Sequence, residues 1–224
     1  MIRKSGLKGN EVDHNKRNRR SMEVLRGTPL APGMAEGRLH IHRIRAGPLD
    51  IPDRIETDGV DDEISRLDLA TLKISDDLVA LASRVEKQID ARLSQLFSVH
   101  KLILEDSSLK EELRKEIVDN LVSASSAVKT VFLRWENRFL MMESQISRDK
   151  ADDIQDLSSR LGDALAGITI HPLEEIPHGC VLATTRLLPS DTIFLRSRST
   201  SAVLLEFGST GSHAALFARE MGLP

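Results

Sequence analysis

Toward its carboxyl end the chain reads Gly208-Ser-Thr-Gly-Ser-His213-Ala-Ala-Leu-Phe-Ala-Arg219, which sets one histidine between a glycine-rich turn and a predicted helix. The apolar run at 201–207 predicts a buried strand before the turn. Glycines let the backbone approach a ligand, and a helix N-terminus presents unpaired N–H groups and a partial positive charge. A histidine there can attack a phosphorus atom while the helix end stabilises the phosphoryl oxygens. A capping or core histidine after an ordinary turn fits the local spacing equally well.

The composition is that of a soluble globular protein of 224 residues, 40% hydrophobic and 29% charged. Only 3% of residues are aromatic, which favours an aliphatic, mostly helical core. No apolar run approaches the ~20 residues that span a bilayer. The single cysteine, Cys180, excludes an internal disulfide framework and fits a reducing cytoplasm. It lies in an apolar strand pattern, so we expect a buried core residue rather than a nucleophile.

Charge is concentrated at the start of the chain. Residues 1–20 hold seven Lys or Arg and two acidic residues, a net charge of +5, whereas the remaining residues carry −8. We therefore expect residues 1–21 to form a disordered basic tail, solvated rather than bound to nucleic acid.

The middle of the chain shows helical periodicity. One apolar stripe runs from Ile64 to Leu96 and predicts a single long helix. Ser108 with Glu111 forms a capping-box pattern for a second helix over 109–121. Third and fourth helices are expected over 128–139 and 151–165, and Gly167 is expected to stop the last one. These stripes predict a four-helix bundle over residues 55–166.

The two regions that flank the helical stripes show a different sequence pattern. Short apolar runs at 168–170, 181–183, 193–195 and 203–207 alternate with proline and glycine, as in an α/β domain. Strands are also expected at 22–25 and 38–45, with His40 and His42 facing solvent. The predicted fold class is α/β plus all-α. Residues 22–50 and 167–224 form one α/β domain built from both ends of the chain, and the helical bundle is inserted between them.

Four further segments carry recognisable motifs. They read Arg26-Gly-Thr-Pro-Leu-Ala-Pro-Gly33, Phe97-Ser-Val-His100-Lys-Leu-Ile-Leu-Glu-Asp106, Lys150-Ala-Asp-Asp-Ile-Gln-Asp156 and Gly179-Cys-Val-Leu-Ala-Thr-Thr-Arg-Leu-Leu-Pro189-Ser-Asp-Thr192. Together with 208–219 they resemble, in the same order, the N-terminal half of Enzyme I of the phosphoenolpyruvate-dependent sugar phosphotransferase system, a phosphoenolpyruvate-utilising enzyme. That resemblance implies a swivelling phosphohistidine domain with an inserted domain that binds the phosphocarrier HPr. It also implies that a final strand and a phosphoenolpyruvate-binding barrel, with Mg²⁺, belong beyond Pro224.

The resemblance assigns His213 as the phosphoryl carrier, through its Nε2 atom. Gly208, Ser212 and Arg219 match the surrounding motif, Thr210 and Gly211 lie within it, and all five would support the phosphate or its loop. Gly211 stands where the family has a threonine whose hydroxyl would orient the imidazole. We expect Ser212 or Thr210 to replace it, unless the site is impaired. Arg219 either neutralises phosphate charge or forms a surface ion pair.

The same resemblance predicts a carrier-binding face on the helical domain. An apolar patch rimmed by carboxylates suits a partner with a basic ring around its own histidine. The alternative is that its leucines are bundle core and its acids merely solvated. The residues assigned to this face are Leu102, Ile103, Asp106, Ser108, Leu109, Lys150, Asp153 and Gln155.

The other histidines are not expected to act. No two lie at metal-binding helix spacing with a carboxylate, so no metal site is predicted. His100 lies on an apolar helix and reads as a satisfied structural histidine.

The sequence thus predicts the cytoplasmic phosphoryl-transfer half of a phosphoenolpyruvate-protein phosphotransferase. Its expected partners are an HPr-like carrier and its own C-terminal domain, with no nucleic acid or membrane. This half is expected to be a monomer and the full protein a homodimer. The alternative is a non-catalytic regulatory or binding module of the same fold. A dikinase or synthase domain is disfavoured by the inserted bundle.

Overall fold

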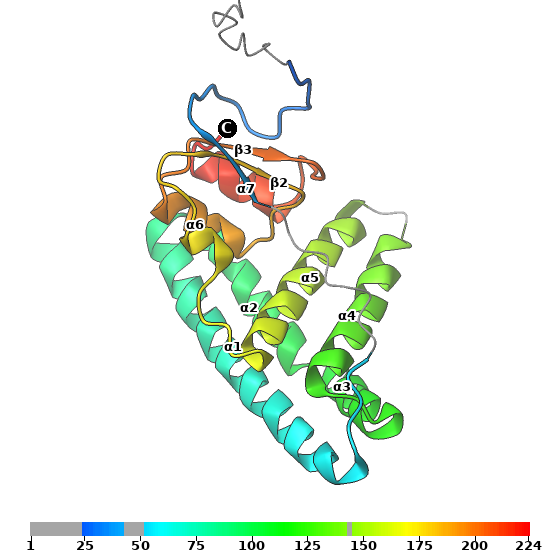
Figure 1. The fold of residues 1–224 in the computed structure, drawn as a ribbon. Helices are drawn as coiled ribbons and strands as arrows, with labels where there is room; N and C mark the ends of the chain where they lie inside the picture. The colour runs from blue at the N-terminus through cyan, green and yellow to red at the C-terminus, as the bar shows by residue number, and fades with distance from the viewer. Residues whose placement is uncertain (1–23, 43–51, 143–144) are drawn as a thin grey trace, which may run out of the picture.

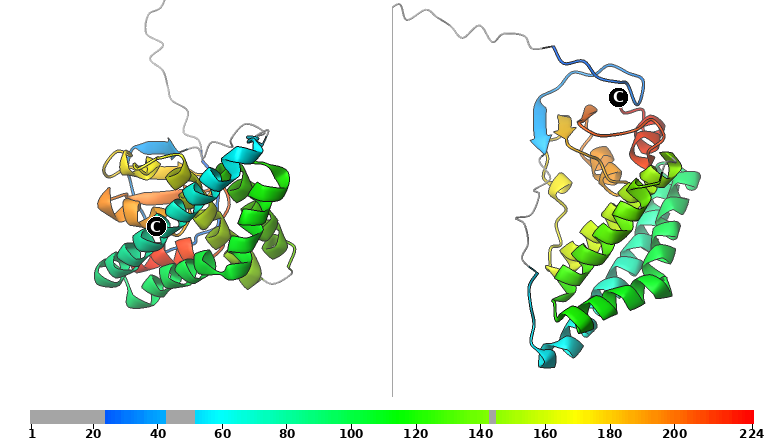
Figure 2. Two further views of the ribbon diagram at one scale, coloured as in Figure 1. Left: turned by 90° about the horizontal axis from the view of Figure 1, so that it is seen from below. Right: turned by 90° about the vertical axis from the view of Figure 1, so that its right-hand side faces the viewer.

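The computed structural model describes residues 24–42, 52–142 and 145–224. The predicted tail at 1–21 and the residues 43–45 of a predicted strand lie outside these ranges. Val24 and Leu25 are exposed and form no strand, contrary to the prediction for 22–25. The described chain forms two parts: five α-helices, and a small sheet with two shorter helices at one end of them (Figure 1, Figure 2).

The first helical pair is a hairpin rather than the single long helix predicted from the stripe. Helix α1 (Val60–Gln88) follows a 3-10 turn, η1 (Thr57–Gly59), and α2 (Ala91–Glu105) begins three residues after α1 ends. Asp90 is extended and its carboxylate accepts hydrogen bonds from the N–H groups of Arg92 at 2.7 Å and Leu93 at 3.0 Å. This N-cap starts a new helix. The apolar periodicity continues across the break, so it gave no sign of two helices.

The remaining helices follow the predicted stripes. Helix α3 (Ser107–Asn120) is capped by Asp106 rather than by the predicted Ser108, and α4 (Ala124–Leu140) is capped by Ser123. Helix α5 (Gln145–Leu165) ends as predicted at Gly167, which has a φ of +70°. The N–H of Ile168 donates to the Asp163 carbonyl at 2.9 Å, a closure that needs this left-handed residue.

The sheet joins both flanks of the helical part. Strands β1 (Leu39–His42), β2 (Val181–Thr184) and β3 (Ala202–Leu205) are parallel, in the order β1-β2-β3. In their register Leu39 pairs with Val181, and Val181 pairs with Ala202. Because β1 precedes the helices and β2 follows them, the helical domain is an insertion, which confirms the predicted fold class.

Two predicted strands are wrong. The run at 193–195 lies in helix α6 (Asp191–Ser197), because Asp191 accepts a hydrogen bond from the Leu188 N–H at 2.7 Å and the Pro189 carbonyl accepts one from the Thr192 hydroxyl at 2.6 Å. These bonds close a turn that leads into a helix. The run at 168–170 is irregular and precedes a 3-10 turn, η2 (Pro172–Glu174).

The predicted facing of β1 is reversed. Leu39 and Ile41 are 53% and 59% exposed, whereas His40 and His42 are partly buried. The register sets the two histidines on the face of Leu182, which is fully buried. Burial lowers the pKa of His42. The run at 201–207 is likewise only half-buried, because β3 lies at the edge of the sheet.

The helical and α/β parts share apolar packing. Phe217 is fully buried and packs against Phe97, with ring centroids 6.0 Å apart. Phe217 and Ile193 both belong to the cluster that fills the helical domain. This shared core fixes helix α7, which carries His213, against α2 and α5.

Candidate functional site

His213 begins helix α7 (His213–Glu220), as the glycine-rich turn predicted. Ser212 caps this helix: its hydroxyl accepts a hydrogen bond from the Ala215 N–H at 3.2 Å and donates one to the Ser209 carbonyl at 2.9 Å. Ser212 is buried and shapes the turn, so it does not orient the imidazole as predicted. Its cap leaves His213 in the first helical turn, where the dipole favours negative charge.

The turn packs against the N-terminal segment. A Cβ at Gly208 would lie 3.0 Å from the Cδ1 end of the Leu30 side chain, a tight contact that a small shift of that leucine could relieve. Arg219 donates to the Leu30 carbonyl and to the Thr210 carbonyl, each at 2.9 Å. Arg219 therefore ties the turn to the N-terminal segment, where the sequence had predicted a phosphate contact or a surface ion pair. Thr210 and Gly211 are exposed on the turn.

The imidazole of His213 is oriented by a carboxylate from the helical domain. Its Nδ1 atom lies 2.9 Å from Oδ1 of Asp153 on α5, and the His213 side chain is 32% exposed. Asp153, predicted as a carrier contact, is buried and 5% exposed. Nδ1 thus faces Asp153, and Nε2 lies on the opposite side of the ring. Sequence reasoning missed this pair, although Asp153 lies in a segment that the family motif singles out.

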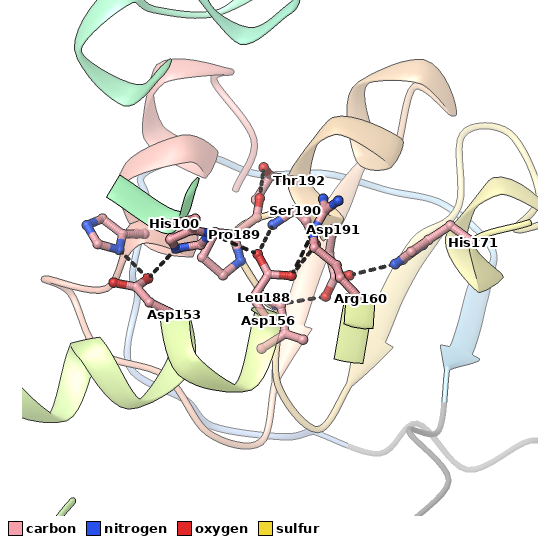
Figure 3. A network of polar contacts seen from close by, with 11 residues as sticks. His100, Asp153, Asp156, Arg160, His171, Leu188, Pro189, Ser190, Asp191 and Thr192 are labelled. Carbon is pink, nitrogen blue, oxygen red and sulfur yellow. Dashed lines mark hydrogen bonds and ion pairs between the residues drawn. The ribbon is translucent and has the colours of Figure 1, made fainter. Parts of the chain in front are cut away.

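Asp153 lies between two histidines. The Oδ1 atom that contacts His213 also lies 3.4 Å from Nε2 of His100, which is fully buried (Figure 3). Burial is the largest single effect and raises the pKa of Asp153. The contacts with His100 and His213 lower this pKa, and together they outweigh burial, so the net shift is downward. Asp153 is therefore an ionised acceptor for an N–H of His213.

A second buried carboxylate extends this network into the α/β domain. Asp156, one turn after Asp153 on α5, accepts hydrogen bonds from the Ser190 N–H at 3.2 Å and the Ser190 hydroxyl at 2.5 Å (Figure 3). It also lies 3.4 Å from Nε of Arg160 and 3.8 Å from Nδ1 of His100. Asp156 thus anchors the Pro189-Ser-Asp-Thr turn to α5, and that anchor keeps Asp153 within reach of His213.

Arg186 makes a further bridge between the domains. It follows β2, and its Nη1 donates to Oε1 of Gln155 at 2.8 Å. The same nitrogen lies 3.1 Å from Asp152 and 3.7 Å from Glu136. Gln155, predicted to contact the carrier, is partly buried and accepts this hydrogen bond from Arg186.

Some residues of the predicted carrier face are exposed and others are buried. Leu102 is 67% exposed, whereas Leu109 is fully buried in the helical core and cannot be a surface anchor. Asp106 and Ser108 are exposed, and the Asp106 carboxylate caps α3 through the N–H groups of Ser108 and Leu109. Lys150 is exposed and Ile103 is partly buried. The exposed or partly buried residues of this face are Leu102, Ile103, Asp106, Ser108, Lys150 and Gln155.

Other predicted residues lie apart from the site. Cys180 is buried in the α/β core, and burial raises the pKa of its thiol. His171 stacks on Phe194 with ring centroids 4.2 Å apart and lies 3.2 Å from Asp191. Among residues 24–42, 52–142 and 145–224, no three His, Cys, Asp or Glu side chains converge to hold a metal ion. Within the same ranges, no helix is long and apolar enough to cross a membrane.

Comparison with solved structures supports this fold. A solution structure of Enzyme I has 22% identity and a TM-score of 0.67, and it covers 90% of this chain and 81% of that one. The N-terminal domain of Enzyme 1 - Nitrogen has 24% identity and a TM-score of 0.59, covering 88% and 79%. At these identities the likeness concerns the fold.

Curated relatives are phosphoenolpyruvate-protein phosphotransferases. The protein of Enterococcus faecalis is 27% identical over 207 residues, covering 90% of this chain and 35% of the relative. That of Bacillus subtilis is 25% identical over 203 residues, covering 91% and 35%. The chain therefore spans about a third of the length of these relatives.

Family models cover most of the described chain. Residues 26–150 match the N-terminal domain of PEP-utilising enzymes. Residues 176–224, which include His213, match their mobile domain. The chain belongs to the PEP-utilising enzyme family.

Proposed function

We propose that this chain is the phosphoryl-transfer part of a phosphoenolpyruvate-protein phosphotransferase, with His213 as the carrier. In this proposal His213 takes a phosphoryl group from phosphoenolpyruvate held by a C-terminal domain and passes it to a histidine of an HPr-like protein. The observation that carries the proposal is the His213–Asp153 contact of 2.9 Å at the start of a helix, in a segment that matches the mobile domain. Family membership and the curated relatives support it.

The contact suits a nucleophilic imidazole. With its proton on Nδ1, facing Asp153, the ring keeps a lone pair on Nε2, and that pair attacks phosphorus. A new N–P bond forms as the bond from phosphorus to the donor breaks. The electron pair of the broken bond leaves with the donor, as the enolate of pyruvate or as the imidazole of the carrier protein. The ring of His213 gains positive charge in this step, and the buried Asp153 carboxylate stabilises it.

The helix N-terminus supplies the remaining electrostatics. The transferred phosphoryl group is anionic, and His213 stands at the positive end of α7, in the first turn after the Ser212 cap. Arg219 keeps the turn in shape through the Thr210 and Leu30 carbonyls. Transfer between two histidines is close to balanced in energy, so the site acts by positioning and charge balance.

The proposed carrier face combines accessible residues of the predicted one with further exposed residues of α1 and α2. Helix α2 carries His100 on its buried side and, two residues later, Leu102 on its exposed side. Leu72 and Val79 add exposed apolar surface on α1, which pairs with α2 through a 3.0 Å hydrogen bond from Ser75 to Glu105. Asp106 and Glu105 are exposed acids at the end of α2. An apolar stripe with acids beside it suits a carrier with a basic rim.

The rest of the whole protein's activity belongs to the same proposal. It includes the phosphoenolpyruvate-binding domain, its Mg²⁺ and homodimerisation. The described residues provide no cluster of metal ligands, so no step is assigned to Mg²⁺ here. A cytoplasmic location is also proposed, supported by the single cysteine, Cys180, which is a buried thiol.

Incubation with ³²P-labelled phospho-HPr tests the carrier role. We expect the chain to take up acid-labile, base-stable label and to return it to unlabelled HPr. His213→Ala should abolish uptake, and His171→Gln should not affect it, since His171 packs on Phe194 instead. Label that persists in the His213→Ala variant would refute the assignment.

A non-catalytic binding or regulatory module is the second candidate. Gly211, where the family has threonine, motivates it because no hydroxyl stands at that position. The Asp153 carboxylate provides another group that orients His213. A folded wild-type chain that binds HPr but takes up no label would favour the module.

A further inference from the structure

An open cleft of about 510 Å³ lies between the two domains, and its lining includes neither His213 nor Asp153. One wall comes from α1 and α5 of the helical domain, and the other comes from residues 168–171, η2 and α6. Ligand sites in proteins commonly enclose roughly 300–1,000 Å³ and occur preferentially at domain interfaces. This interdomain cleft therefore has the size and the position of a small-molecule site.

Arg160 on α5 brings unused hydrogen-bond donors to the interdomain cleft. Its side chain is 19% exposed, and among the residues that the structure describes Asp156 is the one carboxylate at ion-pair distance, 3.4 Å from Nε (Figure 3). Asp156 is already hydrogen-bonded to Ser190, and no nitrogen of the Arg160 guanidinium donates a hydrogen bond within the described chain. A guanidinium with free donors suits a carboxylate, which it can bind through two parallel hydrogen bonds.

Asp163 lies one helical turn after Arg160 on α5 and lines the same cleft. Its carboxylate is partly buried, and within the described ranges it has neither an ion pair nor a hydrogen-bond donor. Burial raises the pKa of Asp163, although the charges of His171 and Arg160 oppose this shift. A cation bound beside Asp163 would offset the cost of burying this carboxylate.

Apolar side chains form much of the remaining surface of the interdomain cleft. They come from α1, α5, α6 and the segment that links the two domains: Ile74, Leu81, Ala164, Phe194, Ile168 and Ile170. Ile168 and Ile170 are 50% and 56% exposed, so an apolar group placed against them would remove apolar surface from water.

The other charged groups of the cleft do not favour a net charge on the ligand. Two of them are basic and two are acidic: Lys73, Arg84, Asp77 and Glu174. His171 also lines the cleft, but its ring nitrogens are engaged with the Leu173 N–H at 3.2 Å and with Asp191 at 3.2 Å. A ligand that carries one positive and one negative charge matches this set better than an anion or a cation.

We propose that the interdomain cleft binds a free amino acid with a large apolar side chain. Arg160 binds its carboxylate and Asp163 its ammonium group, while the side chain lies against the apolar wall. Residues three apart on a helix are neighbours, with about 5–6 Å between their Cβ atoms, so Arg160 and Asp163 can reach two charges carried by one Cα. A phosphate or a simple carboxylate would leave Asp163 without a cation. The inference does not depend on the carrier role of His213.

Isothermal titration calorimetry of the full chain with L-leucine and two analogues tests the ligand class. Isocaproate keeps the side chain and the carboxylate of leucine, whereas isoamylamine keeps the side chain and the ammonium group. We expect L-leucine to bind at one site per chain. Each analogue should bind at least about tenfold more weakly, because it leaves either Arg160 or Asp163 unpaired.

Two variants test the two ends of the site. Arg160→Gln and Asp163→Asn each remove one charge and keep a polar side chain, and each should weaken leucine binding at least about tenfold. Glu86→Gln on α1 and Arg92→Gln on α2 remove exposed charges outside the cleft and should bind leucine as the wild type does. Asp163 makes no ion pair, so Asp163→Asn should fold even if loss of the Arg160–Asp156 ion pair destabilises the other variant.

Three results would overturn the inference. One is the absence of both L-leucine and L-phenylalanine binding by the wild-type chain at about 10 mM ligand. Another is equal affinity for leucine and isocaproate, which would indicate a carboxylate site. The third is unchanged leucine binding by the folded Asp163→Asn protein, which would place the amino acid elsewhere. None of these readouts uses phosphoryl transfer, so failure here would leave the proposed function standing.

Discussion

Asp153 and His213 lie 60 residues apart in the chain and on different domains, yet their side chains meet at 2.9 Å. Asp153 belongs to the inserted helical domain and His213 to the α/β domain. The proposed nucleophile is therefore oriented by a residue outside its own domain. Asp156–Ser190 and Arg186–Gln155 are further contacts between the same two domains.

Asp153→Asn tests the electrostatic role of this carboxylate. Asparagine keeps the shape and an acceptor oxygen but removes the charge that stabilises the His213 ring during transfer. We expect phosphoryl uptake from phospho-HPr to slow on the order of 10- to 1000-fold, with the helical circular dichroism unchanged. Asp76→Asn, an exposed acid on α1, is the matched control and should transfer normally. Equal rates in the two variants would remove Asp153 from the mechanism.

The lowered pKa of Asp153 predicts an acid-dependent loss of stability. Because this pKa falls below its ordinary value of 3.8 on folding, the ionised form stabilises the native state above that value. The contribution is lost as pH falls from the ordinary value through the lowered one. Urea unfolding of the wild type and Asp153→Asn should show a stability difference at pH 7 that shrinks at pH 3. A difference that does not depend on pH would show that the carboxylate is not paired in the fold.

Leu102 and Leu109 should respond oppositely to truncation. Leu109→Ala empties a fully buried position and should cost about 2–5 kcal/mol of unfolding free energy. Leu102→Ala should leave stability nearly unchanged and weaken HPr binding by on the order of 1–2 kcal/mol, mainly through faster dissociation. Thermal unfolding and surface plasmon resonance separate the two effects. If Leu102→Ala binds HPr normally, the carrier face lies elsewhere.

Asp106 combines a cap with an exposed charge, and Asp106→Asn separates the two. Asparagine is as good an N-cap as aspartate, so α3 should keep its stability. Loss of the negative charge should slow association with HPr and flatten its salt dependence, because rim charges act mainly by steering. Stopped-flow association at several salt concentrations measures this. An unchanged rate at low salt would exclude Asp106 from the encounter surface.

The sequence predicted those features that depend on local chemistry. The glycine-rich turn, the helix from His213, the Gly167 stop and the apolar stripes of α4 and α5 follow from periodicity and backbone freedom, and all are present. Local chemistry also explains why some predicted helices and strands were wrong. Asp90 breaks an apolar stripe that continues unchanged past it, and the turn at Pro189 converts a short apolar run into helix α6.

Tertiary contacts could not be predicted in the same way. His40 and Leu39 alternate along β1, and nothing in that alternation says which face is covered and which remains exposed. Asp153 reads as a surface acid on an amphipathic helix until α7 is packed against it. Asp153 and His213 each lie in a segment that resembles a family motif, so the sequence indicated that both residues are functional. It did not indicate that their side chains are in contact. That contact arises from the shared core of Phe97 and Phe217.

The position of the phosphoryl group on the ring tests the central claim most directly. Because Nδ1 of His213 faces Asp153, transfer should modify Nε2. Long-range ¹H–¹⁵N NMR of the ¹⁵N-labelled chain after phosphorylation by phospho-HPr identifies the modified nitrogen. We predict Nε2-phosphohistidine at His213, with Nδ1 still protonated. A phosphoryl group on Nδ1 of His213, or on any other residue, would contradict the account.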